Sequence, residues 1–258
     1  MFFAIPLLLL AWVSLQAGTT VGLTEYARFF TDGLGARVLT STLRIGLETT
    51  LGCLFLAYPL ALVFRASPGW ARSLITLIVL LPLLTSVVVR TFAWIVILGR
   101  QGVVNSMMQS LGLIDTPLRL LYTEGGLVVA LVQVQMPLMF LPLAGTLARI
   151  APNLEEASAA LGAGAWRTFI RVTLPLSLPG ALAGCTLTFA AAVTAFITQS
   201  LVGGGQMLLM PSYIYQQAIA LQNWPFAAAI SMIFLVAVLA VLAMLAALSR
   251  LAKGVAHV

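Results

Sequence analysis

The sequence predicts an all-α integral membrane protein with about six transmembrane helices, and three observations support this fold class. Of its 258 residues, 61% are hydrophobic and 8% are charged, whereas a soluble domain carries about a quarter charged residues. Apolar segments of roughly 20 residues, the helix length that crosses a hydrocarbon layer of about 30 Å, recur along the chain. Most charged residues lie between these segments. We therefore expect one transmembrane domain, residues 1–258, with its core at 40–249.

Six apolar segments are long enough, or nearly so, to cross a membrane as helices. They lie near residues 1–17, 40–64, 73–98, 125–148, 179–200 and 226–249. The first is short and begins at Met1, so it could be mistaken for a signal peptide, but no basic residue precedes it. A signal peptide needs a positive leader and a small-residue cleavage site, and neither is clear. We expect a first span whose cytoplasmic lead is missing or very short.

Prolines and glycines modify several of these spans. Prolines that should bend spans two, three and four are Pro59, Pro82, Pro137 and Pro142. Membrane helices tolerate such residues where neighbouring groups satisfy the freed carbonyls. Gly180 and Gly184 form a G-x3-G pattern in span five. We expect it to serve close helix packing within the chain, with a seam between two subunits as the alternative.

The basic residues determine the predicted orientation. With the N-terminus inside, the cytoplasmic segments hold Arg65, Arg72, Arg149, Arg167, Arg171, Arg250 and Lys253. The outer loops hold Arg28, Arg37, Arg100 and Arg119, matched in number by Glu25, Asp32, Asp115 and Glu124. Because basic residues favour the cytoplasmic side, we expect both termini and the loop 149–178 there. The net charge of +6 is spread among loops, so we expect membrane lipid and no nucleic acid as a partner.

Reactive side chains are too few for several classes of chemistry. His257 is the only histidine, at the tail, so a Ser-His-Asp triad or a histidine zinc site has no suitably placed residue. Cys53 and Cys185 lie in separate apolar spans and should be small core residues. Lys253 is the only lysine, and no G-x4-G-K-[ST] loop occurs. We expect no catalytic residue, metal or cofactor in this chain, so ATP-driven work would need an ATPase on another polypeptide.

The outer loops contain predicted structure. In the segment 99–126 the pattern predicts a short helix at 104–111, ended by Gly112, and a turn at 115–117. Residues 203–205 and 221–226 frame another partly structured outer loop. A docking surface is the expected use of these loops.

The polar segment 151–180, between two apolar spans, predicts two short helices that protrude from the membrane. Asn153 is the expected N-cap, with Glu156 reaching back to it and Glu155 also in the first turn. Gly162 should end this helix. A second helix, 165–172, would place Trp166, Phe169 and Ile170 on one face and stop before Pro175.

A helical loop of this kind could instead lie on lipid headgroups. Arg167 and Arg171 would suit anionic lipid. The adjacent acids Glu155 and Glu156 would be repelled by such a surface, whereas a protein partner accommodates them. We therefore favour a protein partner.

Polar residues inside the spans are candidates for a substrate path. An arginine at the bilayer centre costs about 2.5–3.5 kcal/mol on insertion scales. Arg90 should therefore reach outward, lie over Trp94 through a cation–π contact, or line the path. Glu48 has Arg44 one turn before it, which favours an ion pair over a cation site.

Further path candidates are neutral. Gln133 and Gln135 are two residues apart in span four, so they should point in different directions. Thr194, Thr198 and Gln199 lie in span five.

The run Glu156-Ala157-Ser158, then Gly162 after three residues, then Val172-Thr173-Leu174-Pro175 after nine, resembles the EAA motif of bacterial ABC importer permeases, E-A-A-x3-G-x9-I-x-L-P. Ser158 replaces the second alanine and Val172 replaces isoleucine. The resemblance implies that the loop 149–178 is a coupling helix that docks on an ATP-binding subunit and carries its closing motion into the membrane. The implied coupling residues are Glu155, Glu156, Ala157, Gly162, Leu174 and Pro175, with Trp166 and Arg167 as supporting contacts.

Five further stretches resemble the first permease subunit of spermidine/putrescine importers and their relatives. They are LTEY at 23–26, VRTFAW at 89–94, GVVN at 102–105, LIDTP at 113–117 and NWPFA at 223–227. The resemblance implies a type I ABC importer permease fold in a bacterial inner membrane. It also implies a second permease, commonly in a heterodimer, two ATP-binding subunits that hold ATP and Mg, and a periplasmic solute-binding protein.

The solute and the transport class have alternatives. The resemblance makes a polyamine the first expectation. Glu48 is the only acid inside the predicted spans, which leaves another small polar solute as the second. A secondary transporter should show inverted repeats, and the sequence shows none. A membrane enzyme would need an acidic or histidine cluster in the spans, which is also lacking.

Overall fold

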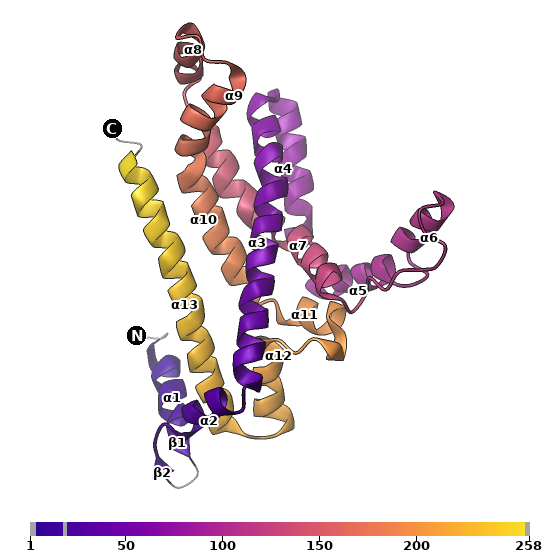
Figure 1. The fold of residues 1–258 in the computed structure, drawn as a ribbon, viewed down its shortest axis with the longest axis vertical. Coiled ribbons are helices and arrows are strands. Elements are labelled where there is room, and N and C mark those ends of the chain that lie inside the picture. Colours follow the sequence, from indigo (N-terminus) through magenta and orange to yellow (C-terminus); the bar gives the residue numbers. More distant parts are fainter. Residues whose placement is uncertain (1–3, 18–19, 256–258) are drawn as a thin grey trace. The chain divides into compact units, whose positions relative to one another are not determined.

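The computed structural model describes residues 4–17 and 20–255, and their backbone is mostly helical (Figure 1). The N-terminal part contains α1 (Ala4–Ser14), the antiparallel strands β1 (Gln16–Ala17) and β2 (Thr20–Val21), and α2 (Thr24–Thr31). The middle part contains α3 (Leu34–Ala66), α4 (Gly69–Leu84), α5 (Val87–Leu98), α6 (Val103–Ser110) and α7 (Glu124–Leu147).

The C-terminal part begins with α8 (Pro152–Ala160), α9 (Ala165–Thr168), the π-helix η1 (Phe169–Thr173) and α10 (Leu174–Val193). It continues with α11 (Phe196–Val202), the 3₁₀ turn η2 (Gly204–Gln206), α12 (Met210–Tyr215), the π-helix η3 (Gln216–Ala220) and α13 (Trp224–Val255). His257 lies outside the described residues, and the side chains of Arg250 and Lys253 are not described.

Five segments among the described residues are long and apolar enough to cross a membrane. They are Leu34–Ala66, Val87–Ser110, Glu124–Leu147, Ala165–Val193 and Trp224–Leu248. Predicted spans two, four and six coincide with α3, α7 and α13. The predicted first span contains α1, whose 11 residues extend about 16 Å at 1.5 Å per residue. The described helix is therefore too short to cross a hydrocarbon layer by itself.

Two predicted spans are interrupted. Span three, expected at 73–98, consists of two helices, because Thr85 has an extended backbone that ends α4 just after Pro82. Span five, expected at 179–200, begins earlier and ends at Val193, and Thr194 and Ala195 separate α10 from α11. The apolar composition continued across both breaks, so hydrophobicity alone concealed them.

The described chain divides into two compact units. The first comprises Met1–Gly46, Ile95–Leu127 and Val193–Val241, and the second comprises Leu47–Trp94, Val128–Ala192 and Leu242–Val258. The assignment of residues 1–258 to one domain stays a prediction.

Side-chain contacts hold the first unit together near its helix ends. The Thr42 hydroxyl accepts the Met210 N–H at 2.9 Å, and the Arg28 guanidinium lies 4.4 Å from the centre of the Phe226 ring. Helix α6 confirms the predicted short helix, and Gly112 ends it at φ +69°. The buried Asn105 amide donates to the Gly99 and Leu118 carbonyls and so fixes this loop.

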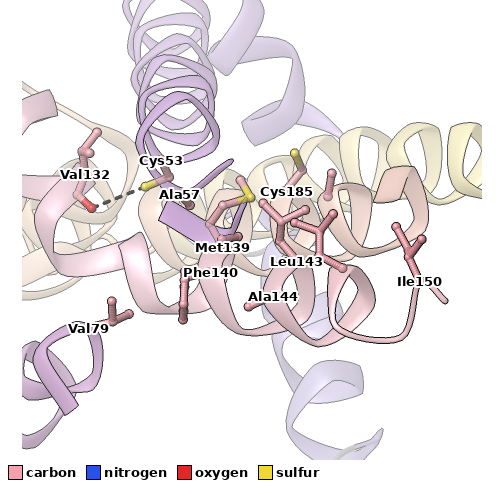
Figure 2. Packing of buried hydrophobic residues seen from close by; sticks show 13 residues of the cluster. Cys53, Ala57, Val79, Val132, Met139, Phe140, Leu143, Ala144, Ile150 and Cys185 are labelled. Atoms are coloured by element: carbon pink, nitrogen blue, oxygen red, sulfur yellow. Dashed lines mark hydrogen bonds between the residues drawn. The ribbon is translucent and has the colours of Figure 1, made fainter. Parts of the chain in front are cut away.

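Small residues allow close packing in the second unit. Cys53, Ala57 and Ala61 lie at successive turns of α3, and buried side chains of α7 and α10 pack with them in one cluster (Figure 2). The Cys53 thiol donates to the Val132 carbonyl at 3.4 Å. Cys185 is also buried and free, so the expectation of two small core cysteines is confirmed.

Gly180 and Gly184 serve packing within the chain, as expected. A Cβ atom at Gly180 would lie 2.4 Å from the Thr146 hydroxyl, and one at Gly184 would lie 2.9 Å from the Met139 carbonyl oxygen. Both neighbours belong to α7. The pattern therefore lets α10 approach α7 closely.

Replacement of Gly184 by alanine should destabilise the protein by about 1–3 kcal/mol, because the new methyl group overlaps the α7 backbone. Thermal unfolding of the purified protein in detergent measures this effect. Gly145→Ala is the matched control, since a Cβ there meets nothing within 4 Å. Equal unfolding temperatures for the two variants would refute the packing role.

Candidate functional site

The candidate site is a helical elbow, residues 151–173, that connects α7 to α10 (Figure 1). Its first helix, α8, begins at Pro152 after the extended residue Ala151, and no side chain caps it. The predicted capping box of Asn153 and Glu156 is therefore wrong. Proline suits the first helical position because its φ is preset and its missing N–H would have no partner there, so the helix starts earlier and Asn153 lies inside it.

Gly162 ends α8, as predicted. Its φ of +80° places it in the left-handed region. The Gly162 N–H donates to the Ala159 carbonyl at 2.9 Å, and the Ala163 N–H donates to the Ser158 carbonyl at 3.1 Å. This pair of bonds is a Schellman motif, in which glycine is strongly favoured. The chain can then turn directly into α9.

The second helix of the elbow does not stop before Pro175, and that prediction is wrong. Helix α9 continues through the π-helix η1 into α10. The Leu174 N–H donates to the Phe169 carbonyl five residues back, which is the π pattern. Because Pro175 has no N–H for the Arg171 carbonyl, a widened turn accommodates it without breaking the helix.

A buried side of the elbow is tied to α3 by three residues, which we call the Glu155 clasp: Arg65, Glu155 and Thr173. Glu155 Oε1 accepts from Arg65 Nη1 at 2.6 Å and from the Thr173 hydroxyl at 2.8 Å. Arg65 Nη2 also donates to the Ile150 carbonyl at 3.2 Å. The Arg65 and Glu155 side chains are 18% and 34% exposed. The clasp thus joins α3, α8 and η1.

The clasp also determines the charge of Glu155. The hydrogen bond from Arg65 lowers the pKa of Glu155 below its ordinary value, partial burial opposes this, and the Thr173 bond and the Arg65 charge lower it further. Sequence reasoning missed Arg65 and Thr173 as site residues. Arg65 lies 90 residues before Glu155, and no local spacing rule pairs residues at that distance.

The other side of the elbow is exposed. Glu156, Ala157, Gly162 and Arg167 all face outward, and Trp166 is 73% exposed. Leu174 and Pro175 are half-buried at the base of the elbow. Of the eight predicted coupling residues, Glu155 alone belongs to the clasp.

An aromatic stack orients Trp166. Its ring stacks on Phe169 with centroids 5.6 Å apart, and Phe169 meets Tyr58 of α3 edge to face at 5.8 Å. The Tyr58 hydroxyl bonds to the buried Ser177 hydroxyl at 2.7 Å. Arg65, Glu155 and Phe169 also line part of a pocket of about 600 Å³.

Arg90 does not lie over Trp94. Its guanidinium donates to the Pro82 carbonyl, which also accepts the Thr85 hydroxyl at 3.0 Å. The end of α4 leaves this carbonyl without a helical N–H partner. Arg90 therefore satisfies the backbone at the break between α4 and α5, in place of the cation–π contact that was one of three expected alternatives.

Trp94 and Gln133 lie together in the second unit. Trp94 Nε1 donates to Gln133 Oε1 at 3.2 Å, and both residues line a pocket of about 430 Å³ with Gly52 and Phe55. Gln135 is buried and does not line this pocket. The prediction that the two glutamines point in different directions is confirmed.

The remaining path candidates lie elsewhere. Thr198 and Gln199 are buried in α11, where Gln199 Nε2 donates to the Val193 carbonyl at 3.4 Å, and Thr194 is exposed at the preceding break. Arg44 Nε lies 3.4 Å from Glu124 Oε1. The pairing and path roles of Glu48 stay predictions.

Known proteins resemble most of the chain. Residues 54–253 match the family described as binding-protein-dependent transport system inner membrane component. The spermidine/putrescine transport system permease protein PotB of Salmonella typhimurium is 35% identical over 83% of this chain and 74% of the relative. PotB of Escherichia coli is 34% identical, over 83% of this chain and 78% of the relative. The putative 2-aminoethylphosphonate transport system permease protein PhnU of Salmonella typhimurium is 28% identical, over 90% and 82%.

Solved structures resemble the fold. A chain of a bacterial ABC transporter involved in the import of the acidic polysaccharide alginate superimposes with a TM-score of 0.81. The match covers 97% of this chain and 90% of that chain at 20% identity. A second structure of the alginate transporter, in complex with a pentasaccharide-bound periplasmic protein, gives the same TM-score. The helices are therefore arranged in a type I importer permease fold.

Acidification should release the elbow by protonating Glu155. Because its pKa is lowered on folding, the stabilisation from the clasp is present above the ordinary glutamate value of about 4.3 and is lost as the pH falls through the lowered pKa. Amide hydrogen exchange of residues 152–163, corrected for intrinsic rates, should rise in that acidic range. Glu155→Gln should remove the transition, and the exposed Glu156→Gln variant should retain it. A transition that survives Glu155→Gln would contradict this assignment.

Proposed function

The chain belongs to the family of binding-protein-dependent transport system inner membrane components and is a permease subunit of an ABC importer, and we propose that its solute is a polyamine of the spermidine/putrescine type. The PotB relatives, at 33–35% identity, support this solute class. In our proposal a periplasmic binding protein delivers the solute. A second permease completes the path, and the pair is a heterodimer.

The exposed face of the elbow is the observation that supports energy coupling. Glu156, Ala157 and Trp166 face outward, while the clasp holds the opposite face of α8 against α3. Helix α8 is anchored at its side and carries the exposed Glu156 carboxylate, so it is suited to contact a protein partner and to follow its movement. We assign that partner role to two ATP-binding subunits, which hold ATP and Mg and carry out the hydrolysis.

Basic residues near the elbow support an orientation of the protein in the membrane. Arg65, Arg72 and Arg149 lie beside the elbow, at the ends of apolar helices or in the loops between them. Basic residues in short loops favour the cytoplasmic side. We therefore assign the elbow to the cytoplasm, which the ATP-binding subunits require, and the cytoplasmic placement of the two termini stays a prediction.

The proposed path uses the pocket beside Trp94 and Gln133. The methylene groups of a polyamine can pack on its apolar wall, and an ammonium group can lie over an indole face or donate to an amide oxygen. Arg90 donates to the Pro82 carbonyl and is not among the residues that line this pocket. The PhnU relative makes an aminoalkylphosphonate the second candidate.

Gly162→Val should abolish uptake while the protein remains in the membrane. Valine in a left-handed conformation costs about 1–2 kcal/mol and would displace the end of α8. Solute uptake and membrane content are measured in cells that carry the complete transporter. Gly164→Val is the matched control, because Gly164 has φ −69° and open space around its Cβ position. Normal uptake by Gly162→Val would count against the coupling role of the elbow.

The solute class is tested in vesicles that contain the whole complex, with ATP inside and the binding protein outside. Radiolabelled putrescine should enter, and excess spermidine should reduce its uptake. Excess 2-aminoethylphosphonate should have no effect, because an anionic phosphonate lacks the second cationic group. ATP-dependent uptake of the phosphonate without uptake of putrescine would assign the second candidate.

A further inference from the structure

We propose that Arg65 is a positioning residue of the transport cycle, which through Glu155 and Thr173 makes α8 and α3 move as one body. The inference rests on the proposed coupling function of the elbow. It assigns to the clasp the transfer of a displacement of α8 to a membrane helix. Without the clasp, the displacement would be absorbed between the elbow and α10.

The connection between the elbow and α10 is the place where motion could be lost. Only the π-helix η1 joins α9 to α10, and Pro175 leaves the Arg171 carbonyl without its usual helical partner. Helices bend most readily at such interruptions. The backbone connection from α8 to α10 can therefore bend. A second connection is needed if a displacement of α8 is to reach the membrane helices without loss.

The clasp is that second connection, and it crosses η1. Glu155 Oε1 receives one bond from α3, through Arg65, and one from Thr173 at the end of η1. Both bonds are short, and the bond from Arg65 is charge-assisted, a type about twice as strong as neutral hydrogen bonds. Arg65 also holds the Ile150 carbonyl, so the chain is fixed just before α8 as well as within it.

The backbone of Arg65 is itself fixed. Arg72 donates through Nε to the Phe64 carbonyl at 3.1 Å and through Nη2 to the Arg65 carbonyl at 2.6 Å. These bonds cap the last turn of α3, whose carbonyls have no helical partners. The Phe64 ring meets Phe140 of α7 edge to face at 5.5 Å. A force on Glu155 thus reaches a rigid helix end that packs on α7.

The sequence offers chemically graded variants of the clasp. Arg65→Met removes both donors, and Thr173→Val removes one hydroxyl at almost constant shape. Arg65→Lys keeps the charge, but its single ammonium group lacks the two separate guanidinium nitrogens that bond Glu155 and the Ile150 carbonyl. The paired reversal Arg65→Glu with Glu155→Arg restores an ion pair in the opposite sense. Arg171→Met is the control, because Arg171 is an exposed arginine of the same elbow outside the clasp.

The experiment measures ATP hydrolysis and putrescine uptake together in proteoliposomes that contain the complete complex and its binding protein. Arg65→Met should raise the ATP hydrolysed per putrescine imported by about tenfold, the scale of losing one charge-assisted bond. Thr173→Val and Arg65→Lys should give intermediate ratios, and the paired reversal should recover part of the loss seen with either single reversal. Arg171→Met should leave the ratio unchanged.

A merely structural Arg65 would give a different result. Arg65→Met would then lower hydrolysis and uptake in parallel, and the ratio would stay constant. That outcome, or an unchanged ratio with full activity, overturns the proposal. If Gly162→Val abolishes uptake while Arg65→Met keeps the ratio, the elbow couples without the clasp. If neither variant affects transport, the coupling function of the elbow itself fails.

Discussion

A chain that crosses hydrocarbon must satisfy its backbone hydrogen bonds within itself, because no water is available to do so. Long helices meet this requirement along their length, and side chains meet it where the helices stop. Arg90 and Thr85 bind the Pro82 carbonyl at the end of α4. Gln199 binds the Val193 carbonyl at the end of α10. Two polar residues that were predicted to line a substrate path, Arg90 and Gln199, thus donate hydrogen bonds to backbone carbonyls.

The same requirement explains why sequence reading succeeded for some elements and failed for others. Uninterrupted apolar length identified α3, α7 and α13, since composition and length are the whole signal for a simple span. It failed at Thr85 and Thr194, where the apolar pattern continues although the helix does not. Pro175 caused the opposite error, since a helix end was predicted where the helix continues. A π-turn allows a helix to pass a proline that would stop a regular α-helix.

Local backbone chemistry was predictable in the elbow, and tertiary contacts were not. Gly162 was correctly predicted to end α8, because a Schellman turn favours a residue that adopts positive φ at low cost. Asn153 was wrongly taken as the N-cap, since Pro152 competes for the helix start and is better suited to it. The Arg65–Glu155 bond joins residues from separate helices, and only the packed structure brings them together.

Glu155 and Glu156 are neighbouring residues of the same type with different surroundings. Consecutive positions on an α-helix point about 100° apart, so two adjacent carboxylates on a helix that lies against a body cannot face the same way. Glu155 faces α3 and is held there by Arg65, whereas Glu156 faces outward. In the proposed coupling role, the outward charge can act only if the helix that carries it keeps a fixed direction. The inward carboxylate provides that direction, so the coupling role proposed for Glu156 depends on the position of Glu155.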